Sequence, residues 1–210
     1  MIIPAHPIET NRRIGSYGER GLTAVDRFGV YLSRRAVLKA IGDRHDLDIL
    51  DLGCGHHARL LRSFGPRLKS GLGVDLNVSR EAKNAESLSF REASLETVLP
   101  ELQSGSFDVV AMLSVLEHLW EPLSVLRDIH RVVRPGGVVL INVPTWRGKP
   151  FLEFSAFRLG TSPAEEMDDH KRYYDKRDLW PMLVQAGFRP SNLRLRYHKF
   201  GLNLFASAVG

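Results

Sequence analysis

The stretch Ile49-Leu50-Asp51-Leu52-Gly53-Cys54-Gly55-His56-His57 decides the fold of this chain of 210 residues. Its apolar residues predict a central strand of a parallel sheet, buried on both faces, that ends in an acid. Gly53 and Gly55 then allow backbone conformations and close approaches that a Cβ atom would forbid. The pattern indicates a turn at which a nucleotide-like ligand lies against the backbone.

The run Gly71-Leu72-Gly73-Val74-Asp75 repeats this plan, because a short apolar strand again ends in a carboxylate. An acid at that place can accept hydrogen bonds from both hydroxyls of a ribose. Gly53, Gly55 and Ala58 have the spacing of the dinucleotide fingerprint, with alanine in the third position. Asp75 lies near the distance expected for its ribose acid. A nicotinamide dinucleotide is therefore one interpretation of the turn.

Two features argue against a dinucleotide. Asp51 precedes the first glycine, and His56-His57 occupy the helix entrance where a pyrophosphate needs small residues. A carboxylate attracts a ligand that carries an ammonium and a sulfonium group. It would repel a pyrophosphate by roughly 1 to 4 kcal/mol for charges about 4 Å apart. Asp51 therefore favours a cationic ligand.

The composition is that of an ordinary globular domain, with 43% hydrophobic and 25% charged residues. No apolar run approaches the roughly 20 residues that span a bilayer, and the first residues lack the order of a secretion signal. The single cysteine, Cys54, excludes an internal disulfide framework. We therefore expect a cytoplasmic protein without a transmembrane segment.

The net charge of +5 is concentrated near the N-terminus. We interpret residues 1–44 as a basic, helical N-terminal leader, followed by the main domain over residues 45–210. A basic leader fits RNA, peripheral contact with an anionic membrane or a phosphorylated substrate, and equally a solvated helical face. The sequence does not indicate an oligomeric state.

Strands and helices alternate along the chain. We expect helices over 24–41, with a kink or break at Gly29, and over 58–64, 122–133 and 175–186. Beyond the first two strands, others are expected over 88–93, 107–113, 138–143, 193–197 and 202–208, with Arg134-Pro135-Gly136-Gly137 as a turn. This order predicts an α/β fold: a Rossmann-like, seven-stranded, mostly parallel sheet with helices on both faces, in a single domain.

An insertion at about 145–174 interrupts the alternation of strands and helices. Long insertions at the carboxyl edge of such a sheet usually form substrate pockets or lids. Its aromatic residues either line a pocket or cover the core, and its cations either hold an anionic group or are solvated. These residues are Trp146, Phe151, Phe154, Phe157, Arg158, Lys171 and Arg172.

From about Leu47 to the C-terminus the chain resembles the class I S-adenosylmethionine-dependent methyltransferases, in particular domains of type 11/23. The matching motifs, in family order, are ILDLGCG (49–55), GVDL (73–76), SFDVVAMLSVLEHL (106–119), RVVRPGGVVLINVP (131–144), DHKRYY (169–174) and AGF (186–188). Several motifs in order are more specific than one.

The resemblance implies the cofactor S-adenosyl-L-methionine and assigns residues to it. Asp51, Gly53, Cys54 and Gly55 would border the cofactor, and Asp75 would hold the ribose. Leu76, Ser94 and Leu95 would lie near the adenine, and Leu113 and Ser114 near the methyl group. The chain departs from the family pattern at His57, where many relatives have a third glycine, and at Ser94, where many have an acid.

Methyl transfer to a hydroxyl needs a base, and imidazole suits this role near neutral pH. His118 and His170 are the candidates, although a histidine at a helix start can also be structural. The candidate substrate-binding residues are Glu117, His118, Trp146, His170, Arg172 and Tyr173. Some related quinone-precursor O-methyltransferases place metal ligands at Glu117 and His118, but their earlier glutamate is Ser114 here, and we expect no metal.

The sequence therefore predicts a methyltransferase (EC 2.1.1 type) acting on a small or carrier-linked acceptor. The resemblance extends to bacterial methyltransferases associated with surface saccharide or lipid building, which suggests a saccharide or lipid precursor hydroxyl. Three alternatives stay open: an RNA methyltransferase, a nicotinamide-dependent oxidoreductase, and a non-catalytic cofactor binder. Nucleic acid is not favoured, because no separate RNA-binding module is visible.

Overall fold

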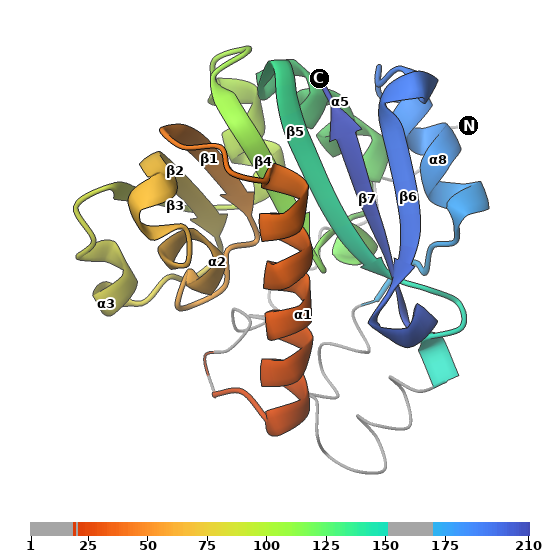
Figure 1. The fold of residues 1–210 in the computed structure, drawn as a ribbon, viewed down its shortest axis with the longest axis horizontal. Coiled ribbons are helices and arrows are strands. Elements are labelled where there is room, and N and C mark those ends of the chain that lie inside the picture. Colours follow the sequence, from red (N-terminus) through yellow and green to blue (C-terminus); the bar gives the residue numbers. More distant parts are fainter. Residues whose placement is uncertain (1–18, 20, 151–169) are drawn as a thin grey trace, which may run out of the picture.

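The computed structural model describes residue 19, residues 21–150 and residues 170–210, which form an α/β fold around one seven-stranded sheet (Figure 1). The strand order is β3-β2-β1-β4-β5-β7-β6. The strands are β1 (Leu47–Leu52), β2 (Leu68–Asp75), β3 (Leu88–Glu92), β4 (Phe107–Leu113), β5 (Val133–Pro144), β6 (Leu193–His198) and β7 (Asn203–Val209). Strands β1 to β5 pair in parallel, and β7 is antiparallel to both β5 and β6. The predicted mostly parallel, Rossmann-like sheet is confirmed.

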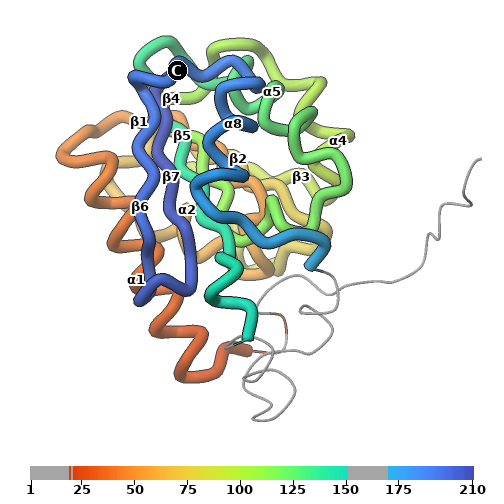
Figure 2. The backbone as a smooth tube through the Cα atoms, turned by 90° about the vertical axis from the view of Figure 1, so that its right-hand side faces the viewer, coloured from red at the N-terminus to blue at the C-terminus, as the bar shows by residue number. Residues whose placement is uncertain are grey.

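Helices cover both faces of this sheet. The helices are α1 (Ala24–Ile41), α2 (Arg59–Arg62), α3 (Arg80–Lys83), α4 (Leu95–Val98), α5 (Pro122–Val132) and α8 (Lys176–Gln185). Short 3-10 turns are η1 (Gly65–Arg67), η2 (Leu99–Glu101), η3 (Leu116–His118), η4 (Pro190–Asn192) and η5 (Lys199–Gly201). Figure 2 shows α1 on one side of the sheet and α4, α5 and α8 on the other. Of the helices described, none has the length and apolar character needed to cross a bilayer.

The core is divided by β1, whose six residues are all buried. Ile49 belongs to the cluster that includes Val37 of α1, whereas Leu50 and Leu52 belong to the cluster formed with α4, α5 and α8. Successive side chains of a strand point to opposite faces, so an apolar strand can fill both clusters. This burial fixes β1 at the centre and places the following turn at the carboxyl edge of the sheet.

Helix α1 packs on the same sheet through Ala36, Val37 and Ile41, so residues of the basic leader contribute to the core. The expected break into two helices at Gly29 is wrong, because α1 runs as one helix of 18 residues. A Cβ atom built on Gly29 would lie 3.6 Å from Nζ of Lys199. The glycine thus lies where α1 faces η5, and the helix continues through it. The domain boundary at residues 44 and 45 stays a prediction.

Two other expectations differ from the structure. The helix expected over 58–64 shortens to α2, because Ala58 adopts a left-handed conformation and Gly65–Arg67 form a 3-10 turn. The expected turn at Arg134 is instead the first part of β5. Arg134 donates to Asp108 over 2.6 Å and to Asp48 over 2.9 Å, which ties the start of β5 to the sheet.

Candidate functional site

The glycine turn is held against β2 at the carboxyl edge of the sheet. Gly53 and Gly55 have φ angles of 73° and 72°, the left-handed conformation that glycine adopts without strain. The amides of Gly53 and Cys54 donate to the carbonyl of Val74 over 2.8 and 3.2 Å. A Cβ atom on Gly53 would lie 2.2 Å from Cγ2 of Val115. The turn therefore requires glycine at position 53 for both conformation and space.

Asp75 is fixed at the mouth of this turn. Its Oδ2 accepts a hydrogen bond from the amide of Gly55 at 2.7 Å, and its Oδ1 accepts one from the amide of Leu76 at 2.8 Å. A carboxylate oxygen can accept more than one hydrogen bond. The carboxylate is thus oriented by these two backbone amides at the edge where a pair of hydroxyls is expected.

Asp51 supplies the test of whether a cationic cofactor fits. The residue is 2% exposed, and its Oδ2 has no hydrogen-bond partner among the described residues. Burial, and to a lesser extent the nearby charge of Asp75, raises the pKa of Asp51 to about 7. A sulfonium and an ammonium would favour the ionised carboxylate. The arrangement therefore fits S-adenosylmethionine better than a pyrophosphate.

Cys54 contributes space and backbone to the turn. Burial raises the pKa of its thiol, so the reactive thiolate is disfavoured. Cys54 therefore suits packing within the turn better than a nucleophilic role.

The residues expected near the adenine lie around Asp75. Leu76 is 62% exposed, as expected of a side chain free to flank a ring. Ala93 donates its amide to the carbonyl of Asp75 over 3.1 Å, which brings Ser94 and the start of α4 to the same edge. The Ser94 hydroxyl is 3.0 Å from that of Thr97, and Leu95 is buried.

The residues expected near the methyl group lie at the end of β4. Ser114 follows Leu113 with a left-handed φ of 58°, and its amide donates to the carbonyl of Asn142 over 2.8 Å. The Asn142 side chain is fully buried and donates to the Ser114 hydroxyl over 3.4 Å. Sequence reasoning missed Asn142, although an amide within the apolar run 138–143 was a visible signal.

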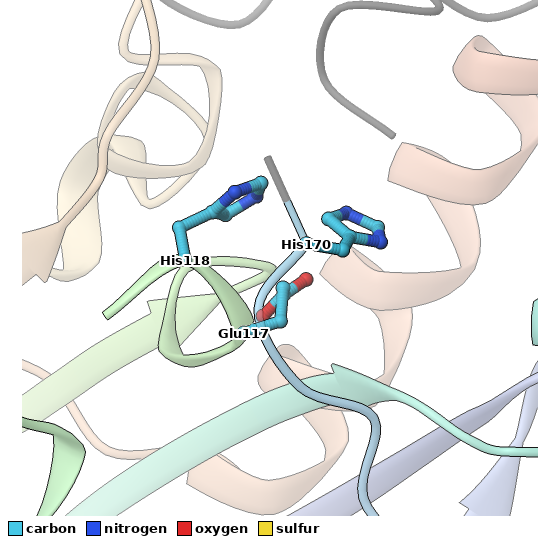
Figure 3. A group of neighbouring side chains, drawn as sticks. All are labelled: Glu117, His118 and His170. Carbon is cyan, nitrogen blue, oxygen red and sulfur yellow. The ribbon is translucent and has the colours of Figure 1, made fainter. Parts of the chain in front are cut away.

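Just beyond Ser114, three titratable side chains converge, and Figure 3 shows them together. Glu117 and His118 belong to η3, and His170 comes from the C-terminal part of the insertion. Their possible ligand atoms all lie within 4.8 Å of one another, and the two imidazole rings have centroids 4.8 Å apart. The two histidines proposed as bases are therefore neighbours.

Glu117 is the buried member of this group, with 1% exposure and no hydrogen-bond partner for Oε2 among the described residues. Burial raises the pKa of Glu117 to about 8, although its own backbone and Lys199 oppose the rise. Sequence reasoning missed Lys199, whose pKa burial lowers to about 8. One carboxylate and two imidazoles are also a donor set that could hold a transition metal. The expectation of no metal stays a prediction.

The segment 170–174 is anchored beside η3. Lys171 donates its amide to the carbonyl of Glu117 over 2.9 Å, and Tyr174 donates its amide to that of Pro144 over 3.0 Å. Tyr174 is buried, and its hydroxyl bonds the carbonyl of Leu116 at 3.3 Å. These contacts fix where His170 lies.

Of the other predicted substrate-binding residues, Tyr173 and Arg172 belong to this segment, and Trp146 lies next to Tyr173. The Tyr173 ring lies 5.6 Å from that of His170 and 5.5 Å from that of Trp146. Arg172 instead donates to the carbonyl of Trp120 at 3.4 Å. Phe151, Phe154, Phe157 and Arg158 lie outside the described residues.

Comparison with known proteins identifies the family. The family described as "Methyltransferase domain" matches residues 25–193. Ubiquinone biosynthesis O-methyltransferase of Pseudomonas aeruginosa is 33% identical over 111 residues, which cover 50% of this chain and 47% of that protein. A protein of Mycolicibacterium smegmatis named "Probable S-adenosylmethionine-dependent methyltransferase" is 29% identical over 164 residues, covering 74% and 57%. The chain thus spans about half the length of the curated relatives it matches.

Solved structures agree at the level of the fold. A SAM-dependent methyltransferase from Archaeoglobus fulgidus has a TM-score of 0.66 at 15% identity, covering 91% of this chain and 96% of its own. One from Mesorhizobium loti has a TM-score of 0.62 at 16% identity, covering 85% and 98%. With the glycine turn, the two acids and the motif order in place, the chain belongs to the class I S-adenosylmethionine-dependent methyltransferases.

Proposed function

We propose that the protein transfers a methyl group from S-adenosylmethionine to a hydroxyl of a small or carrier-linked acceptor, with His118 as the base. One observation carries the proposal: His118, His170 and Glu117 meet directly after β4, beside the cofactor edge of the sheet. The curated relatives named as O-methyltransferases support an oxygen acceptor. A saccharide or lipid precursor remains our proposal for its class.

The residues divide the work between orientation and proton transfer. S-adenosylmethionine, when bound, supplies a methyl group already activated by a sulfonium. Asp75 would hold the ribose, and Asp51 would lie near the cationic end of the cofactor. Correct orientation of donor and acceptor is worth roughly 7 to 11 kcal/mol. His118 would take the acceptor's proton, while His170, edge-on to its ring, limits where that ring can lie.

The family assignment removes the nicotinamide-dependent oxidoreductase from the alternatives. An RNA methyltransferase and a non-catalytic cofactor binder remain. Exposed basic residues of α1 are the feature that favours RNA, namely Arg27, Arg34, Arg35 and Lys39. The anchored segment 170–174 beside His118 instead favours a small acceptor. The two remaining alternatives differ in the product expected from labelled S-adenosylmethionine: the first predicts labelled RNA, and the second predicts no labelled product.

The test uses labelled S-adenosylmethionine and extracts separated into lipid, nucleotide-sugar and RNA fractions. We expect methyl transfer into a fraction that ribonuclease does not affect, and its loss in His118→Ala with unchanged cofactor affinity. Label in intact RNA would favour the RNA alternative. Cofactor binding without transfer to any fraction would favour the non-catalytic binder.

A further inference from the structure

Figure 1 shows that the ends of β5 and β6 lie near the start of α8. Side chains from these places line a basic hollow. It has a volume of about 460 Å³ and is lined by Arg147, Asp175, Lys176, Arg177 and Tyr197. Three cations therefore face one carboxylate. In the part of the chain that the structure describes, none of these cations forms an ion pair.

Two of the cations are gathered on one aromatic ring. The Arg147 guanidinium carbon is 6.0 Å from the centroid of the Tyr197 ring, and Nζ of Lys176 is 5.2 Å from it. Each cation gains from the ring, but their mutual repulsion opposes the arrangement. An anion bound in the hollow would be attracted to both cations.

The backbone that presents Arg147 is fixed. Thr145 is fully buried, donates its amide to the carbonyl of Leu202 over 3.0 Å and its hydroxyl to that of Gly201 over 2.7 Å. A Cβ atom on Gly148 would lie 2.3 Å from the carbonyl oxygen of Leu202, so only glycine fits there. Arg147 thus lies between Thr145 and Gly148, both of which contact the segment Gly201–Leu202.

Helix stability does not explain the other two cations. Lys176 and Arg177 are the first two residues of α8. The partial positive charge at a helix start favours acids there and disfavours cations by a few tenths of a kcal/mol or more. Side chains that are unfavourable for local structure, such as cations at a helix start, are expected at functional sites.

The hollow connects to the proposed active site through neighbouring rings. Trp146, next to Arg147, has its ring 5.5 Å from that of Tyr173, which lies 5.6 Å from His170. His170 in turn neighbours His118. A long acceptor could therefore occupy both places at once.

We propose that this hollow binds a phosphate or diphosphate group of the acceptor while the acceptor's hydroxyl lies at His118. The inference rests on the proposed function and narrows its substrate class to phosphorylated acceptors. The lining has three basic side chains and one acidic side chain. The net charge of +2 matches a phosphate monoester, which carries about −1.5 to −2 near neutral pH.

The first experiment measures binding of inorganic phosphate and of pyrophosphate to the full chain by calorimetry. We expect Arg147→Gln and Lys176→Gln each to weaken binding about tenfold, the loss expected for one charge-assisted hydrogen bond. Lys39→Gln, on the exposed face of α1, is the matched control for net charge and should bind normally. Equal affinity in all variants, or none in the wild type, would overturn the hollow as an anion site.

The second experiment separates free phosphate from a phosphorylated acceptor. Treating the accepting extract fraction with alkaline phosphatase or pyrophosphatase should abolish methyl acceptance or raise its KM. Unchanged acceptance after complete dephosphorylation would overturn the proposed substrate class. S-adenosylmethionine affinity, measured in parallel, should be unchanged in the Arg147 and Lys176 variants. Failure of the wild type to bind S-adenosylmethionine would instead count against the proposed function itself.

Discussion

At the scale of single residues, two acids at neighbouring strand ends have opposite environments. The carboxylate of Asp75 accepts two backbone hydrogen bonds, whereas Oδ2 of buried Asp51 has no partner among the described residues. We therefore expect the first acid to accept hydroxyls and the second to interact with a positive charge. The glycine pattern alone also fits a dinucleotide. The buried Asp51 favours a sulfonium cofactor over a dinucleotide.

Asp75→Ala should weaken S-adenosylmethionine binding by about 2 kcal/mol, roughly thirtyfold in Kd, because two hydrogen bonds to a carboxylate are lost. The measurement is calorimetric titration of the folded variant. Asp75→Asn, which keeps one acceptor oxygen, should lose less. An unchanged Kd in a folded Asp75→Ala protein would refute the ribose assignment.

His118→Ala should lower kcat about 100-fold or more while leaving cofactor affinity unchanged, as expected for loss of a general base. Single-turnover assays with the identified acceptor measure this. Because we expect no metal, EDTA should not change wild-type turnover. His45→Ala, at an exposed position before β1, controls for loss of an imidazole. Normal turnover in His118→Ala would remove the residue as the base, and loss of activity in EDTA would indicate a metal.

The sequence allowed prediction of Asp51, Gly53, Gly55 and Asp75, because a strand ending in an acid or glycine turn is a local pattern. His170 lies in the insertion, so its proximity to His118 depends on tertiary packing that no local pattern reveals. Lys199 lay beyond reach of either argument. It approaches Glu117 only because β7 pairs with β5 and η5 therefore returns to the carboxyl edge.

At the scale of elements, α1 is the clearest case of local rules and tertiary packing acting together. Thr23 accepts from the amide of Asp26 at 3.2 Å, and Asp26 accepts from the amide of Thr23 at 3.1 Å, which completes a capping box. The sequence predicted this start and the strands around it, but not the shortness of α2 or the early start of β5. Those depended on Ala58 adopting a left-handed backbone and on the ion pairs of Arg134.

Thr23→Ala should lower the free energy of unfolding by about 1 kcal/mol, the usual cost of losing an N-cap. Urea denaturation at constant pH measures it, and Thr23→Ser should restore most of the loss because its hydroxyl can still cap the helix. If the alanine variant is as stable as the wild type, the first turn of α1 contributes nothing to cooperative folding.

At the scale of the whole molecule, buried acids lie at the edge of the sheet where the cofactor is expected. Asp51 and Glu117 both have raised pKa values, so folding favours their protonated forms. Asp48 has the opposite shift, because Ser70, Arg134 and Lys69 outweigh its desolvation and lower its pKa. At neutral pH, Asp51 and Glu117 therefore lower the free energy of unfolding at the carboxyl edge of the sheet. Asp48 raises it at the opposite ends of the strands, where Ser70, Arg134 and Lys69 lie.

This division predicts how stability depends on pH. Between about 4 and 7, folded Asp51 binds more protons than unfolded Asp51, so its contribution to the free energy of unfolding falls as pH rises. Asp51→Asn removes this loss and should make the ligand-free protein more stable than the wild type at pH 8, by roughly 1 to 4 kcal/mol, but not at pH 4. Chemical denaturation at both pH values measures the difference, with exposed Asp43→Asn as control. S-adenosylmethionine should stabilise the wild type more than Asp51→Asn, because only the wild type supplies a counter-charge. If Asp51→Asn changed the free energy of unfolding equally at both pH values, ionisation of Asp51 would not be the cause of the pH dependence.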